Sequence, residues 1–276
     1  MDNRILDAYV ATHHADPAGA ELRVIVRPEY ITLATEIKGR LMGPRSPYAG
    51  TVEIAYPVRE LARTDHILLR VLVPEPNFWQ PQSPLLYEGP LELWQDGARV
   101  EQIWLRHGIR NVQLGERGLR VNGQLCKLQG VCAETFTETD ARHWHDEGIN
   151  LMLTPARDDT IDLLQISDRF GLCVLGRIEQ PHQWPRWPLA CQRYPSFLGC
   201  VLTAAVDNVG ERLAVPGLLG AEVAGAGTAP AGRFDFVVMQ SGQQATLMMP
   251  TILKIAAAET PPAPSNALLG WMRQSL

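Results

Sequence analysis

The chain has 276 residues, of which 46% are hydrophobic and 20% are charged, a composition that is typical of a globular protein and argues against disorder. The formal net charge of −5 gives no general attraction to polyanions, so we expect no nucleic-acid partner. The N-terminus lacks the pattern of a signal peptide, and no run approaches the roughly 20 apolar residues of a membrane span, so a cytoplasmic chain is the expectation.

Residues 1–114 are predicted to form a β-sandwich. Several short strands, separated by Pro, Gly, Asp and Asn, are the pattern of that architecture. The predicted strands are 4–9, 21–26, 30–37, 52–56, 66–73, 90–94 and 100–114. Trp79 and Tyr87 lie between the predicted strands 66–73 and 90–94. We interpret both as core or edge aromatics of the sandwich rather than as sugar-stacking residues.

The pattern changes at about residue 115 from strands alone to strands that alternate with helices. Asn122-Gly123 is the dipeptide of a tight hairpin turn and leads into an apolar run. The elements predicted after it are a strand at 125–131, a helix at 137–147, a strand at 149–154, a helix at 158–170 and a strand at 172–175. Cap signals begin the first helix, and Gly148 and Gly171 mark the two helix ends.

Five motifs resemble segments of glycoside hydrolase family 2, which includes β-galactosidases, β-glucuronidases and β-mannosidases. In chain order they are Trp79-Gln-Pro81-Gln-Ser-Pro84-Leu-Leu-Tyr87, Arg106-x-Gly-Ile-Arg110, Leu-x-Val-Asn-Gly123, Lys127-Leu-x-Gly130-Val131, and Tyr194-Pro195-Ser196 before an apolar strand at 197–203. The resemblance runs to about residue 205. It implies an immunoglobulin-like sandwich at 1–114 joined to a TIM barrel, or (β/α)8 barrel, that begins at about 115. The jelly-roll domain that usually precedes the sandwich in this family is expected to be absent.

The second domain is predicted to be an incomplete, degenerate (β/α) barrel at 115–260. It would either lack some of the usual helices or form an open sheet that resembles half of a barrel. The apolar runs at 218–223, 234–239 and 245–255 are joined by short links rich in Gly, Ala and Pro, which leave little room for ordinary barrel helices. About 160 residues follow the change of pattern at residue 115, whereas a typical barrel has roughly 250 residues.

The segment 261–276 reads as a Pro-rich spacer and a C-terminal tail. Ser265 is a cap signal for a short final helix that would carry Leu268, Trp271 and Met272. These three apolar side chains are candidate contacts to a protein partner, and packing of the tail on its own domain is the equally weighted alternative.

The resemblance also indicates where catalysis would reside, and the chain departs from it there. In the family the acid/base is the Glu of an Asn-Glu pair that closes the fourth barrel strand, and the matching positions here are Ala204 and Ala205. Alanine can neither donate nor accept a proton. We therefore expect no catalytic residue at this position.

The other strand ends depart from the family in the same way. The sequence has Cys132-Ala133-Glu134 where the family has Asn-Arg-His, Leu153-Thr154-Pro155-Ala156 where it has an Arg and Thr-Ser-His, and Gly176-Arg177 where it has Asp-Glu. Glu134 and Glu179 remain as substitute carboxylates with a small chance of forming a new catalytic pair. Glu222 is interpreted as a surface or sheet-end residue.

The sequence therefore predicts a non-catalytic protein similar to glycoside hydrolase family 2, a pseudoenzyme that serves as a structural or accessory subunit. Its expected partner is a protein in a larger assembly, and that assembly could be a membrane complex. One alternative is an active β-glycosidase of β-galactosidase type with relocated carboxylates, and another is a carbohydrate-binding protein without turnover. No cofactor is expected, and no metal either, because His143 and His145 are two residues apart on a predicted helix and point different ways.

Overall fold

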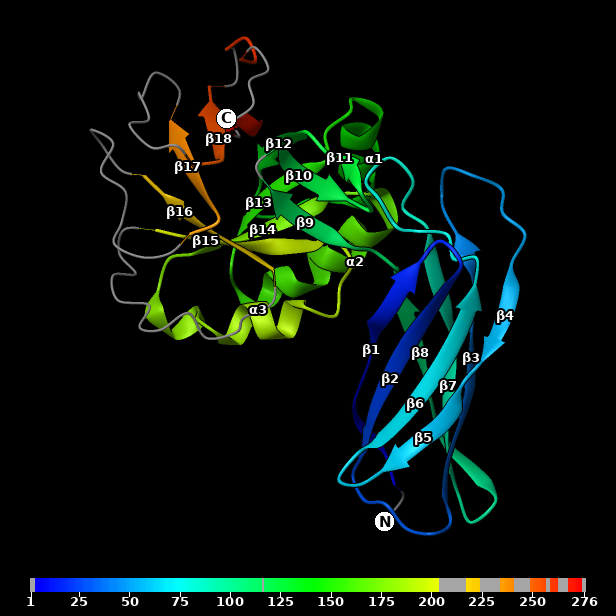
Figure 1. Cartoon of the computed structure of the whole chain (residues 1–276). Coiled ribbons are helices and arrows are strands. Elements are labelled where there is room, and N and C mark those ends of the chain that lie inside the picture. Colours follow the sequence, from blue (N-terminus) through cyan, green and yellow to red (C-terminus); the bar gives the residue numbers. More distant parts are fainter. Residues whose placement is uncertain are drawn as a thin grey trace. The chain divides into compact units, whose positions relative to one another are not determined.

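The computed structural model divides the chain into two compact units, residues 1–110 and residues 111–276 (Figure 1). The structure describes residues 3–115, 117–203, 217–223, 234–240, 249–256, 259–262 and 268–274. Within these ranges, no helix combines the length and the apolar character that crossing a bilayer would require.

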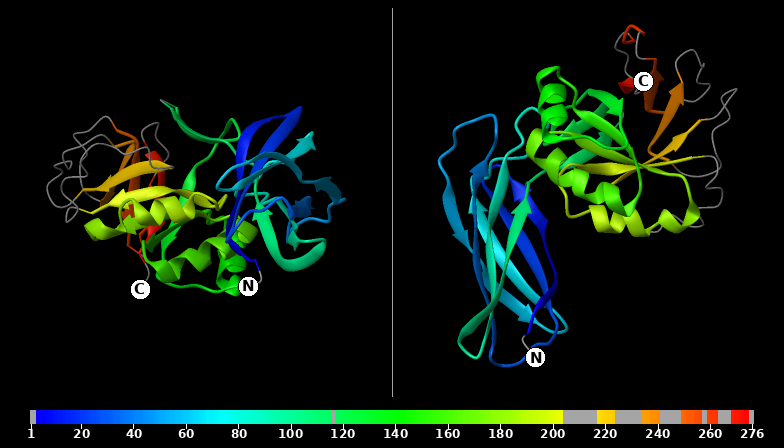
Figure 2. Two further views of the ribbon diagram at one scale, coloured as in Figure 1. Left: turned by 90° about the horizontal axis from the view of Figure 1, so that it is seen from below. Right: turned by 180° about the vertical axis from the view of Figure 1, so that it is seen from behind.

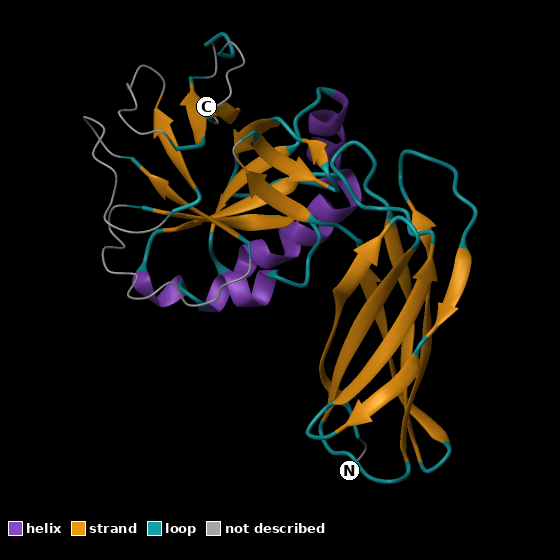
Figure 3. Ribbon diagram, viewed as in Figure 1, coloured by secondary structure: helices purple, strands orange, loops and turns teal. Residues whose placement is uncertain are grey.

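The first unit is built from two four-stranded antiparallel sheets. One sheet has the order β1 (Ile5–Asp16), β2 (Gly19–Pro28), β6 (Ile67–Pro74) and β5 (Arg59–Arg63). The other has the order β4 (Ile54–Pro57), β3 (Thr35–Arg45), β7 (Leu86–Gln95) and β8 (Ala98–His107). Figure 3 shows that the described part of this unit contains strands and loops without a helix.

The core of the first unit forms because alternate residues of each strand point to the same side. Leu22, Val24 and Val26 of β2 are fully buried, and so are the alternate residues of β6 beside it. Trp79 and Tyr87 are also fully buried, which confirms their interpretation as core aromatics. The sequence did not predict β5, because its exposed charged side chains lack the alternating pattern of a half-buried strand.

A small three-stranded sheet opens the second unit, in the order β11 (Gln124–Leu125), β10 (Gly118–Val121) and β9 (Val112–Gly115). Asn122 and Gly123 connect β10 to β11 with φ angles of 53° and 78°. Positive φ at both central residues is what a tight hairpin turn between twisted strands requires. The predicted hairpin is confirmed.

Eight parallel strands then close into a barrel in which each strand pairs with the next along the chain. They are β12 (Leu128–Cys132), β13 (Leu151–Pro155), β14 (Cys173–Ile178), β15 (Phe197–Leu202), β16 (Leu218–Glu222), β17 (Phe236–Gln240), β18 (Thr251–Ile255) and β19 (Leu268–Arg273). The ring closes where β19 pairs with β12, Gly270 lying beside Leu128.

Three α-helices and two 3-10 turns stand between the first four barrel strands: α1 (Glu138–Asp146), η1 (Asp158–Thr160), α2 (Ile161–Phe170), η2 (Pro181–Gln183) and α3 (Arg186–Cys191). As predicted, Thr137 caps α1 and Gly171 ends α2 in the left-handed conformation. The three α-helices lie side by side, α2 against β14 and α3 against β15 (Figure 2). After β15, the described segments contain strands and no helix.

The expectation of an open half-barrel was wrong, because the ring of strands is closed and its last strand lies beyond the predicted boundary at residue 260. The predicted final helix was also wrong, because residues 268–273 form β19 and pair with strands on both sides. A Cβ at Gly270 would overlap the Leu128 carbonyl, so this glycine permits the close approach of β12. Ser265, the predicted cap, lies outside the described residues.

The strand also changes the role of the three predicted partner contacts. Met272 is fully buried in the barrel, so its side chain cannot contact a partner in this conformation. Leu268 and Trp271 are half-buried, and both belong to a paired strand instead of a free tail.

Candidate functional site

A cavity of about 370 Å³ opens at the carboxyl ends of the barrel strands. It is lined by Cys132, Ala133, Glu134, Leu153, Thr154, Pro155, Arg177, Glu222, Gln240, Lys254 and Gln274. These residues lie in the carboxyl-terminal halves of six strands, or within two residues after the end of a strand. Active sites of (β/α)8 enzymes are built at this end of the barrel, so the cavity is the candidate site.

The strand register brings the polar side chains of this cavity to one face. Side chains of directly paired residues in a parallel sheet point to the same side. Lys254 pairs with Gln240 on one side and with the buried Met272 on the other. Glu222 pairs with Val238, which is two residues before Gln240 and therefore shares its face. Glu222, Gln240 and Lys254 consequently point into the barrel together.

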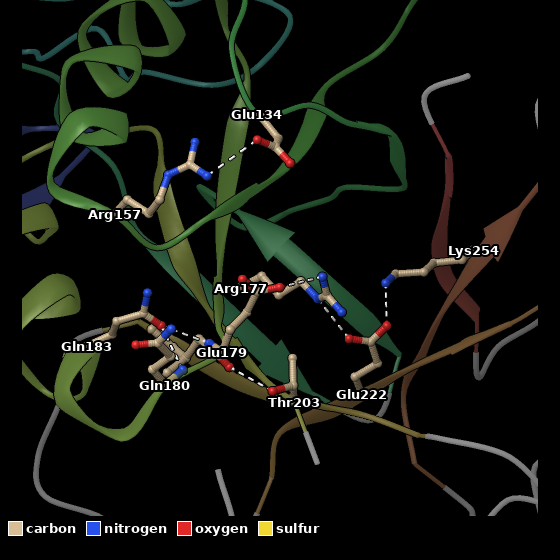
Figure 4. Close-up of polar contacts among 10 residues, drawn as sticks. Glu134, Arg157, Arg177, Glu179, Gln180, Gln183, Thr203, Glu222 and Lys254 are labelled. Atoms are coloured by element: carbon tan, nitrogen blue, oxygen red, sulfur yellow. Dashed lines mark hydrogen bonds and ion pairs between the residues drawn. The ribbon is translucent and has the colours of Figure 1, made fainter. Parts of the chain in front are cut away.

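Glu222 is the centre of an ion-pair network at the cavity. Lys254 Nζ donates to Glu222 Oε1 at 2.5 Å, and Arg177 Nε donates to Glu222 Oε2 at 3.0 Å. Figure 4 shows the two cationic side chains approaching the carboxylate. The side chain of Glu222 is 18% exposed and that of Lys254 is 7% exposed.

The electrostatics of this network keep Glu222 ionised. Burial raises the pKa of the Glu222 carboxyl, but the hydrogen bond and charge of Lys254, with those of Arg177, outweigh burial, and its pKa lies below the ordinary value. A carboxylate in this state can accept a proton or anchor cations. At neutral pH it holds no proton of its own, so it can donate only a proton that it has first accepted.

Of the two substitute carboxylates predicted from the sequence, Glu134 lines the cavity and Glu179 contacts the lining residue Arg177. Glu179 accepts a hydrogen bond from Arg177 Nη1 at 2.7 Å, so Arg177 bridges Glu179 and Glu222. Glu134 lines the cavity, is 73% exposed and forms an ion pair with Arg157 at 3.4 Å. Each of the three carboxylates near the cavity is therefore paired with a cation.

Cys132 brings a thiol to the same cavity at the end of β12. Burial raises the pKa of this thiol, and the charges of Lys254, Glu222 and Arg177 also reach it. A thiol with a raised pKa stays protonated at neutral pH and is a weak nucleophile.

The remaining predicted positions contribute nothing further to the described site. Ala204 and Ala205, the positions that match the family acid/base, lie outside the described residues. His143 and His145 lie on α1, which supplies no residue to the cavity. Across the ranges that the structure describes, no three His, Cys, Asp or Glu side chains gather as metal ligands would.

The sequence singled out Glu222 only as a surface or sheet-end residue, and it did not single out Lys254. Glu222 does lie at a sheet end, but it faces the cavity instead of open solvent. Lys254 lies within the predicted apolar run at 245–255 and was treated as part of it. The signal that could have identified it is a single cation inside an otherwise apolar strand, because a charged side chain in such a place requires a partner.

Comparison with solved structures shows which fold this is. The chain resembles a β-glycosidase from Bacteroides vulgatus with a TM-score of 0.63 and 15% identity over 94% of this chain and 39% of that one. It resembles a β-glucuronidase from Parabacteroides merdae with a TM-score of 0.64 and 12% identity over 87% of this chain and 35% of that one. It resembles a β-glucuronidase from glycoside hydrolase family 2 with a TM-score of 0.63 and 12% identity over 98% of this chain and 37% of that one.

These likenesses establish the fold of glycoside hydrolase family 2 for this chain, and the chain spans well under half the length of each of these structures. The sequence matches no protein-family model and no curated protein.

Proposed function

We propose that this chain is a non-hydrolysing protein with the glycoside hydrolase family 2 fold that acts as a structural or accessory subunit of a larger assembly. The observation that carries the proposal is the pairing of the Glu222 carboxylate with two cations. This half-buried carboxylate lies at the end of the barrel where a catalytic group would be expected, yet Lys254 and Arg177 hold it in an ion-pair network.

Glycoside hydrolysis needs a proton for the leaving group. Retaining and inverting glycosidases both use a protonated carboxylic acid to protonate the leaving oxygen. The network lowers the pKa of Glu222, which opposes that role. Glu134 and Glu179 each pair with an arginine. Among the described carboxyl groups of the cavity, a proton donor of this kind is missing.

Exposed apolar side chains of the first unit support the accessory role. Large apolar side chains in water cost about 25 cal/mol per Å² of apolar area, so their burial by a partner is favourable. The most exposed of them in this unit are Leu6, Leu33, Val52, Ile54, Leu72 and Trp104.

The test is a hydrolysis assay with aryl β-glucuronide and aryl β-galactoside on the purified chain, beside Glu222→Gln. The expected result is that both proteins give the same background rate. Turnover by the unaltered chain that disappears in Glu222→Gln would overturn the proposal. Mass measurement of the native protein after mild isolation tests the assembly, and a monomer without partner contradicts that part.

One observation favours a second candidate, an active β-glycosidase with relocated carboxylates. Glu134 and Glu222 line the same cavity at the catalytic end of the barrel. In that case Glu134 would act as the acid and Glu222 as the ionised partner. Loss of turnover in both Glu134→Gln and Glu222→Gln, with Glu53→Gln in the first unit as the active control, would establish it.

A further inference from the structure

Lysine is scarce in this chain, and one of its few lysines lies in the cavity. The 25 basic residues comprise 22 arginines and only three lysines, Lys38, Lys127 and Lys254. Lys254 is the one that lines the cavity. Arginine is the better partner in a fixed ion pair, because its planar group donates in two directions. A lysine adds a different property, an amine that can lose its proton and form a covalent bond.

Among the described residues, Lys254 finds an acceptor for only part of its hydrogen-bonding capacity. An ammonium group carries three N–H donors. The structure gives one of them an acceptor, Glu222 Oε1, and within the described ranges Lys254 makes no second hydrogen bond. A cation that is only 7% exposed gains from further acceptors, and the adjoining cavity is the place where they can enter.

We propose that Lys254 is a carbonyl-trapping residue, whose Nζ forms an imine with a small polar aldehyde or α-keto acid in this cavity. The inference goes beyond the proposed function and does not rest on it. Three observations carry it: the buried Lys254 amine at the cavity, the Glu222 carboxylate that is hydrogen-bonded to it, and the N–H donors of Lys254 for which the described residues supply no acceptor.

The reaction balances with the groups present. Glu222 takes one proton from the Lys254 ammonium, and the lone pair of the neutral amine forms a C–N bond to the carbonyl carbon. The carbonyl π electrons move to its oxygen, which receives a proton from the nitrogen to give a carbinolamine. Glu222 then returns its proton to that hydroxyl, and water leaves. The products are one iminium cation and one water.

The charge at the cavity is the same before and after this reaction. An ammonium cation is replaced by an iminium cation, so the ion pair with Glu222 persists. Arg177 contacts the other oxygen of the carboxylate and holds its orientation through both proton transfers. Arg177 is thus a positioning residue, whereas Lys254 and Glu222 would touch the reacting atoms.

The lining of the cavity selects the class of carbonyl compound. Gln240 pairs directly with Lys254 in the sheet, and Gln274 Nε2 donates to Gln240 Oε1 at 3.2 Å. Amide and guanidinium groups favour a ligand with hydroxyl or carboxylate oxygens. A volume of about 370 Å³ suits a small molecule.

The test is reductive trapping on the whole, unaltered chain. The protein is incubated at neutral pH with pyruvate or, separately, with glycolaldehyde, reduced with sodium borohydride, and mapped by peptide mass spectrometry. Because there are only three lysines, each adduct can be assigned. The expected occupancy at Lys254 is at least about tenfold that at Lys38 or Lys127 with one of the two compounds. Lys38 also pairs with a carboxylate, that of Glu36, but both side chains of that pair are more than half exposed, whereas Lys254 and its base Glu222 line a cavity.

The two compounds distinguish the two kinds of carbonyl ligand. Preferential trapping of pyruvate identifies an α-keto acid site, and preferential trapping of glycolaldehyde identifies an aldehyde site. Adducts on Lys38 and Lys127 with Lys254 unmodified would overturn the proposal. The absence of a Lys254 adduct with both compounds would overturn it as well.

Three variants separate the roles of the residues. Lys254→Arg keeps the cation and removes the amine, so the cavity adduct should disappear while the other lysines are labelled as before. Glu222→Gln keeps the amine and removes the base, and the trapping rate at Lys254 should fall about 100-fold. An unchanged rate would contradict the role of Glu222. Lys127→Arg is the matched control and should leave the Lys254 adduct unchanged.

Discussion

Lys254 on β18 and Glu222 on β16 form an ion pair that passes over β17, the strand between them. Arg177 on β14 contacts the other oxygen of the same carboxylate. One carboxylate therefore ties together three strands that are not neighbours in the ring. Loss of any one member of this network therefore affects strands that lie apart in the ring.

The first prediction concerns that network. Lys254→Met keeps the length of the side chain and removes its charge, which leaves Glu222 half-buried with Arg177 alone. Removal of one partner of a buried ion pair should lower the free energy of unfolding by about 2–4 kcal/mol. Denaturant unfolding measures this value. Lys127→Met is the control, because Lys127 is exposed, and its loss should be about 1 kcal/mol or less. Equal losses in the two variants would contradict the prediction.

The second prediction concerns His107 in the first unit. Its Nε2 lies 2.8 Å from Thr12 Oγ1, and its Nδ1 is buried without a hydrogen-bond partner in the described structure. Burial lowers the pKa of His107 to about 4, and the charge of Arg110 acts in the same direction.

The sign of the pH effect follows from that shift. Between pH 6.5 and about 4 the unfolded chain binds the proton and the folded chain does not, so stability is full above pH 6.5 and falls as the pH is lowered. The loss should reach about 3 kcal/mol. Hydrogen exchange of the β1 and β8 peptides at several pH values measures it. His107→Gln should remove this dependence, and an identical pH profile in the variant would refute the assignment.

The third prediction concerns Gly176 on β14. A Cβ at this position would overlap the indole ring of Trp187 on α3, which packs directly on the strand. Overpacking typically costs 1–3 kcal/mol, so Gly176→Ala should lower the free energy of unfolding by about 2 kcal/mol. Gly19→Ala on β2 is the control, because nothing lies within 4 Å of its added Cβ. Thermal unfolding that is equal in the two variants would show that α3 does not pack on β14 in this way.

The fourth prediction concerns the start of α1. Thr137 Oγ1 accepts a hydrogen bond from the Asp140 backbone N–H, and the Asp140 carboxylate accepts one from the Thr137 backbone N–H in return. Thr137→Ala should destabilise the helix by about 1 kcal/mol, seen as faster hydrogen exchange in α1. Thr137→Ser retains the hydroxyl and should exchange like the unaltered chain. If serine and alanine behave alike, the cap is not formed.

The features that could be predicted from the sequence are those that short segments determine. The turn at Asn122-Gly123, the cap at Thr137 and the helix end at Gly171 each depend on one or two residues, and the structure confirms all three. The early barrel strands were predicted because each is a continuous apolar run bounded by clear signals.

The features that were missed depend on residues far apart in the chain. β19 was predicted as a helix because the spacing of its apolar residues suits one, whereas its conformation is set by pairing with β12 and β18. The pairing of Glu222 with Lys254 depends on the register of three strands, which no local pattern specifies. The site therefore required the structure.

The pairing of β12 with β19 has a consequence for the order in which the chain folds during synthesis. Leu128 and its neighbour Gly270 are separated by roughly 140 residues, so the first strand of the ring waits for its second neighbour until nearly the whole unit has left the ribosome. Until then the outer edges of β12 and of the growing sheet offer unpaired backbone groups to other chains. A chaperone that shields strand edges would therefore find a binding site on this chain from the emergence of β12 until that of β19.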